Sequence, residues 1–147
     1  CLDCYIKEVF DVGFLLNRKM KKTLEFAFYS HLEIFKTDLL ALVNSDCLTE
    51  DTFITAKRKY TQSVLDYMMN SIENVGASSH IRKIQILHDP SACGFDFEWG
   101  ELNPGLVYAC VYFVLTGKQA ETAPCIYFNH FVAAIIDNAL QELDKQV

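Results

Sequence analysis

The sequence between Asn103 and Ile136 carries almost no charge, and this segment limits how the chain can fold. Lys118 and Glu121 are its only formal charges, and both lie near its middle, close to Gly117. The residues on either side are mostly apolar or aromatic. Such a segment is stable in water only when other parts of the chain cover it. We therefore expect two buried elements, joined by a turn near Gly117, at the centre of the molecule.

The first of these two elements has the start and stop signals of a helix. Asn103 is a favourable N-cap, Pro104 suits the first helical position, and Gly117 suits a helix end. A buried strand would also fit this run of Val, Tyr and Phe, because periodicity cannot separate the two for an all-apolar run. The cap and the stop favour a helix over about residues 104–116.

A second helix is expected from about residue 122 to residue 144. Its inward face would consist of Phe128, Phe131, Val132, Ile135, Ala139 and Leu143. An antiparallel hairpin of the two helices would place Cys125 opposite the end of the first helix and not its middle. A bridge between Cys110 and Cys125 is therefore disfavoured.

Three earlier segments have apolar residues at helical spacing. They cover residues 3–16, 20–43 and about 49–76. In the third, Thr49 is the expected N-cap and Gly76 the expected end. The predicted fold is therefore an all-α single domain over residues 1–147. We expect a disulfide-bonded bundle of five or six helices around the central apolar helix at about 104–116.

The segment between the third helix and Asn103 fits two interpretations. Ser78 or Ser79 could cap a short helix through Ile81, Ile84 and Leu87, whereas residues 84–86 alone would also fit a strand fragment. The residues that follow, up to Trp99, contain Pro90 and several aromatic side chains. They are expected to form a loop that lies on the core or on a ligand.

Six cysteines indicate an oxidising compartment. An even number of cysteines in 147 residues fits three disulfides, and the 15 possible pairings stay open. The residues in question are Cys1, Cys4, Cys47, Cys93, Cys110 and Cys125. The chain also begins with Cys and not Met, as a mature secreted protein does, although a trimmed chain would begin in the same way. We expect a secreted protein; the alternative is a cytosolic protein with buried free thiols.

The charge and the hydropathy pattern disfavour a nucleic-acid partner and a membrane-spanning segment. A formal net charge of −6 and an isoelectric point near 5.1 disfavour nucleic acid, because phosphate neutralisation needs clustered Lys and Arg. No run reaches the ~18 uncharged residues that would predict a transmembrane segment.

The sequence contains no pattern typical of a catalytic or metal site. His88-Asp89 followed by Cys93 is locally similar to the His-Asp pair of secreted phospholipases A2. This chain lacks their paired cysteines before the histidine and their glycine-rich calcium loop. Of the four histidines, His31 is expected to be a hydrogen-bonded core residue; the others lie far apart in the sequence. We therefore predict no enzyme, no metal and no cofactor, with a secreted hydrolase as the weakest alternative.

Two sets of residues are candidates for binding. Basic residues could form one patch for a partner protein: Arg18, Lys19, Lys21, Lys22, Lys57, Arg58 and Lys59. Apolar residues could line a cavity for a small hydrophobic ligand: Met68, Met69, Phe95, Phe97, Trp99, Phe113, Phe128 and Phe131. The leading prediction is a secreted, non-enzymatic protein that acts by contact with another extracellular protein. The alternative is a carrier of a hydrophobic ligand.

Overall fold

The computed structural model describes residues 18–72, 76–97 and 101–146, and in these ranges the backbone is helical with no strand. Residues 18–30 are helical. The elements that follow are α2 (Leu32–Asn44), α3 (Glu50–Ser71), α4 (Ala77–His88), the short 3₁₀ helix η1 (Pro90–Cys93), α5 (Pro104–Thr116) and α6 (Thr122–Gln146). The predicted all-α fold is confirmed. The helix predicted over residues 3–16 lies outside the described residues.

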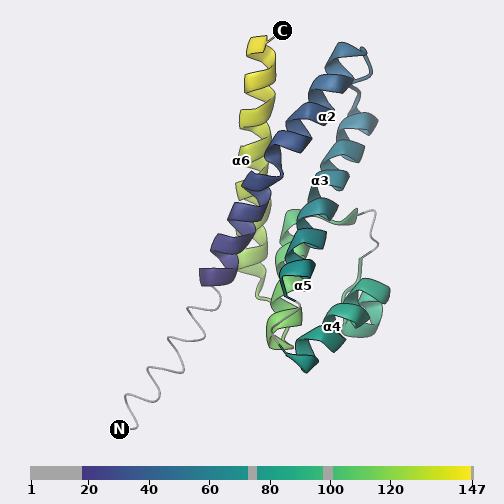
Figure 1. Ribbon diagram of the computed structural model, residues 1–147, viewed down its shortest axis with the longest axis vertical. Coiled ribbons are helices and arrows are strands. Elements are labelled where there is room, and N and C mark those ends of the chain that lie inside the picture. Colours follow the sequence, from purple (N-terminus) through teal and green to yellow (C-terminus); the bar gives the residue numbers. More distant parts are fainter. Residues whose placement is uncertain (1–17, 73–75, 98–100, 147) are drawn as a thin grey trace.

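The apolar helix α5 is the centre of the lower half of the molecule. It contacts α3, α4 and α6, and α4 lies across the lower end of the bundle (Figure 1). Eight of its 13 residues are buried, including Val107, Cys110, Val111 and Val114. The prediction of a central apolar helix over 104–116 is therefore confirmed, with the same bounds.

Two asparagine side chains satisfy the backbone donors at the start of α5. Asn103 Oδ1 accepts a hydrogen bond from the Leu106 backbone N–H at 3.0 Å, as the predicted N-cap should. Asn129 Oδ1, on α6, accepts one from the Gly105 N–H at 2.9 Å. At the other end, Gly117 has φ 74°, which is the left-handed conformation expected at the end of the helix.

The loop between α5 and α6 runs back along α5, so the first turn of α6 ends beside the first turn of α5. A Cβ atom added to Gly105 would lie 2.6 Å from the Cys125 carbonyl oxygen. The five residues 117–121 can span roughly 16 Å when extended, about the helical rise over the eleven steps from Gly105 to Thr116. The expectation that Cys125 lies at the far end of α5 was wrong for this reason.

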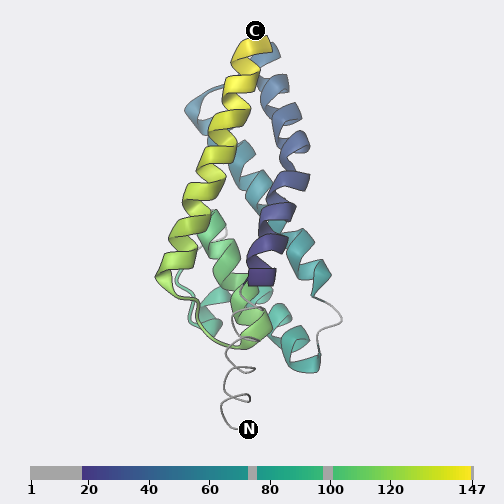
Figure 2. The same ribbon diagram turned by 90° about the vertical axis from the view of Figure 1, so that its left-hand side faces the viewer.

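The upper half of the molecule consists of α2, the first half of α3 and the second half of α6 (Figures 1 and 2). The Tyr60 hydroxyl on α3 donates to the Phe28 carbonyl, and the Tyr60 ring stacks on Phe35 with centroids 4.8 Å apart. Lys36 on α2 forms an ion pair with Glu142 on α6. The two long helices α3 and α6 therefore contribute to both halves.

The helix predicted over 20–43 is interrupted at His31. The Ala27 carbonyl accepts hydrogen bonds from the His31 backbone N–H at 3.2 Å and from the Ser30 hydroxyl at 3.0 Å. It also lies 2.8 Å from His31 Nδ1. Side chains that compete for a helix carbonyl bend helices. His31 is hydrogen-bonded, as predicted, but it is only half-buried and not in the core, and its ring also contacts the Tyr67 ring.

The ends of α3 agree only in part with the sequence prediction. Thr49 is the N-cap, and it forms a reciprocal capping box with Thr52. The helix ends at Ser71, several residues before Gly76, which is instead the N-cap residue of α4. The predicted capping of α4 by Ser78 or Ser79 was therefore wrong, while the helical interpretation of residues 77–88 is confirmed.

Candidate functional site

The residues predicted to line a ligand cavity pack into two separate groups. Phe95 contacts Phe97 and Phe113, with ring centroids 6.2 and 5.6 Å apart. Phe128 instead contacts Phe131 at 6.2 Å and Tyr108 at 5.0 Å. Such contacts between rings are typical of a filled core. The structure does not bring these rings together around one cavity.

Of the remaining residues of the predicted ligand site, the structure describes the two methionines but not Trp99. Met68 and Met69 are buried on α3, and Met68 lines a groove described below. Trp99 lies outside the described residues. The predicted wall residues thus occupy at least three places in the molecule.

The two basic segments do not form one patch. Lys59 pairs with Asp38 on α2 at 3.1 Å, whereas Lys19 lies beside Ser71 at the other end of α3. Twelve residues separate Lys59 from Ser71, which is about 18 Å along a helix. Lys21 lies over the Tyr127 ring, 4.2 Å from its centroid.

The remaining predicted partner-binding cations are exposed. Lys57 and Arg58 lie on the outer side of α3, and Arg18, Lys19 and Lys22 lie at the start of the first described helix. No carboxylate within the described ranges forms an ion pair with any of these five side chains.

Three of the described cysteines lie around α5. The pKa of the buried Cys110 thiol is raised to about 12, first by burial and then by the nearby Cys93 and Cys125 thiols. Cys47 is exposed at the turn after α2. All four described cysteines are free in this structure, and Cys1 and Cys4 lie outside the described residues.

Of the His88-Asp89 pair, Asp89 has a structural role in this chain. Asp89 caps η1, since its Oδ1 accepts from the Ser91 N–H at 3.1 Å and from the Ser91 hydroxyl at 2.6 Å. These hydrogen bonds, led by the one from the hydroxyl, lower the pKa of Asp89. Across the described ranges, no group of three or more His, Cys, Asp or Glu side chains is placed to hold a metal ion.

The most unusual surface belongs to α4, which turns polar side chains inward. Arg82 Nε donates to the Val114 carbonyl near the end of α5 at 3.0 Å. Lys83 is buried, and its Nζ donates to the Met69 carbonyl near the end of α3 at 3.4 Å. The carbonyl ends of helices carry partial negative charge, so they attract cations. Two cations thereby fix the orientation of α4.

This orientation leaves apolar side chains of α4 in solvent. Ile81, Ile84 and Leu87 are 55%, 54% and 38% exposed, and they follow one another at a spacing of three residues. Residues three apart lie on neighbouring positions of a helix surface. We call Ile81, Ile84 and Leu87 the α4 stripe. Sequence periodicity found these residues but not the direction in which they face.

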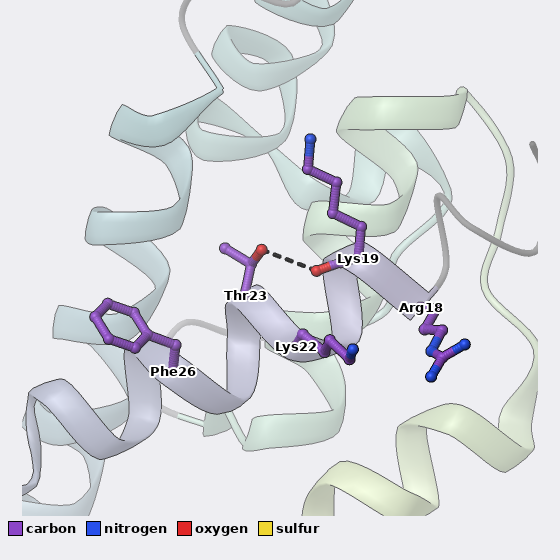
Figure 3. A pocket seen from close by; sticks show the side chains of 5 residues that line it. All are labelled: Arg18, Lys19, Lys22, Thr23 and Phe26. Carbon is purple, nitrogen blue, oxygen red and sulfur yellow. Dashed lines mark hydrogen bonds between the residues drawn. The ribbon is translucent and has the colours of Figure 1, made fainter.

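A groove lies between the start of the first described helix and the ends of α3 and α5. Its volume is about 310 Å³, and its lining residues are Lys19, Met20, Thr23, Met68, Ser71, Ile72 and Leu115. Lys19 and Thr23 also border an open hollow of about 600 Å³, together with Arg18, Lys22 and Phe26. Figure 3 shows Lys19 extending away from Arg18 and Lys22.

Within the described residues, no helix is both long enough and apolar enough to span a membrane. Comparisons of this chain with protein-family models, curated proteins and solved structures gave no match.

Proposed function

We propose that this protein acts by contact with another extracellular protein, and that the α4 stripe is its contact surface. The observation that carries the proposal is the orientation of α4, which directs Lys83 and Ile86 into the bundle and leaves Ile81 and Ile84 in solvent. Large apolar side chains grouped on one exposed face are typical of protein interaction sites.

The chemistry of the stripe indicates an apolar partner surface. α4 contains no acidic residue, and its two cations already contact helix ends. Its exposed neighbours are neutral or weakly basic, including His80, Gln85 and His88. A partner would therefore bury the stripe in an apolar groove or against an apolar helix face, with burial of Ile81 and Ile84 as the main source of affinity.

The test is a capture experiment from the extracellular fluid in which the protein occurs. Ile84→Lys should lower partner binding at least tenfold, because a charged side chain would replace an apolar contact at the centre of the stripe. The variant should fold normally, since residue 84 is exposed. Capture would be measured with immobilised protein and quantitative mass spectrometry.

Gln85→Lys provides the matched control, because it adds the same charge at the next exposed position of α4. Specific recognition through the stripe requires that a partner is retained by Gln85→Lys and lost by Ile84→Lys. Equal capture by both variants would exclude the stripe. Loss of self-association in sedimentation experiments, with no other protein captured, would identify a second copy of the chain as the partner.

We also propose that the protein is secreted and that its cysteines pair as disulfides. The even number of cysteines supports this proposal, as does the position of the Cys93, Cys110 and Cys125 thiols around one helix. Pairing of the four described cysteines would need movement of the backbone, because they are free in this structure and a disulfide requires Cβ atoms about 3.8 Å apart.

Mass spectrometry of native, alkylated protein tests the disulfide proposal directly. We expect no alkylated cysteine before reduction and six after reduction. Six alkylated cysteines before reduction would contradict both the disulfide framework and the extracellular assignment.

A further inference from the structure

The groove beside Lys19 has an apolar floor and a single charged end. Met20, Met68 and Ile72 are buried at its base, and Leu115 from α5 forms a further wall. Lys19 is exposed at the rim. Methionine side chains are flexible and adapt to apolar chains of different shape.

The other polar groups of the groove are already hydrogen-bonded. Thr23 Oγ1 donates to the Lys19 carbonyl at 2.8 Å, and Ser71 Oγ donates to the Tyr67 carbonyl at 2.9 Å. A ligand therefore needs no polar group along its length. The ammonium of Lys19 forms no ion pair within the described part of the chain, so one anionic group at the end of the ligand would be complementary to it.

We propose that this groove binds the anion of a long-chain fatty acid. The alkyl chain would lie on Met20, Met68 and Ile72, and the carboxylate would contact Lys19 at the rim. The adjoining hollow offers the exposed Phe26 ring as further apolar surface, whereas Arg18 and Lys22 extend away from Lys19. A volume of about 310 Å³ is at the lower end of the range for ligand sites, about 300–1,000 Å³, and the hollow extends it.

This site is separate from the α4 stripe, so its test does not depend on the proposed partner. The full chain would be titrated with the fluorescent fatty acid cis-parinaric acid, followed by displacement with oleate. Ser71→Trp should lower the affinity at least tenfold, because an indole ring at the exposed rim would occupy the groove. Lys19→Gln should lower it about two- to fivefold, which is the range of an exposed ion pair.

Two matched variants distinguish this site from non-specific binding. Asn70→Trp adds the same ring at the adjacent exposed position of α3, outside the groove, and should leave the affinity unchanged. Lys57→Gln removes a cation on the distant part of α3 and should also have no effect. Absence of probe binding, or equal loss in Ser71→Trp and Asn70→Trp, would overturn the proposal. Displacement by oleyl alcohol as strong as that by oleate would overturn the assignment of an anionic ligand.

Discussion

Phe128→Ala is expected to lower the free energy of unfolding by about 3–5 kcal/mol, the range for removing a buried aromatic ring. Phe128 is 0% exposed and contacts the Tyr108, Tyr127 and Phe131 rings. Water is not expected to fill the resulting cavity, because its walls are mainly aromatic and offer few hydrogen-bond partners. The measurement is urea unfolding followed by circular dichroism.

Ile126→Ala is the control for this prediction, because Ile126 lies two residues away on α6 and is about half exposed. Ile126→Ala should lower the free energy of unfolding by less than about 1 kcal/mol. A loss below about 1 kcal/mol for Phe128→Ala would show that the ring is not packed as the structure has it. If Phe128 lined a ligand site instead, Phe128→Ala would weaken ligand binding and change the free energy of unfolding little.

Gly105→Ala is expected to destabilise the protein by about 2–3 kcal/mol, although alanine normally stabilises a helix relative to glycine by about 1 kcal/mol. The new Cβ would lie 2.6 Å from the Cys125 carbonyl oxygen and 3.0 Å from Asn129 Nδ2. The carbonyl belongs to the α6 backbone and cannot rotate away. Relief therefore requires that α5 and α6 move apart, which also lengthens the hydrogen bond from the Gly105 N–H to Asn129.

Thermal unfolding would measure this effect against Asn138→Ala. Residue 138 is exposed on α6, so alanine there should leave the melting temperature unchanged or raise it slightly. A Gly105→Ala protein as stable as the wild type would contradict the close approach of α5 and α6.

The helices were largely predictable because their signals are local. Asn103, Pro104 and Gly117 define the two ends of α5, and Thr49 defines the start of α3. The approach of α5 and α6 was not predictable, since it depends on the direction of the loop between them. Gly105 and Asn129 are 24 residues apart, and neither residue alone signals that the two helices meet there.

The candidate surfaces were less predictable than the fold. Ile81, Ile84 and Leu87 have the spacing of a buried helix face, yet they are exposed because Arg82 and Lys83 contact carbonyls at the ends of other helices. These contacts are long-range, and periodicity contains no information about them. The distance between the basic segments around Lys19 and Lys59 was not predictable either, because it follows from the antiparallel arrangement of the first helix and α3.

The sharing of α3 and α6 between the two halves has a consequence for unfolding. On α3, Tyr60 packs against Phe35 in the upper half, whereas Met68 lies near Leu115 in the lower half. On α6, Phe128 packs against Tyr108 in the lower half, whereas Leu143 lies near Leu40 in the upper half. Melting one half would fray a helix on which the other half depends for its own packing. Both halves should therefore lose order together, in a single cooperative transition, in spite of the elongated shape of the molecule.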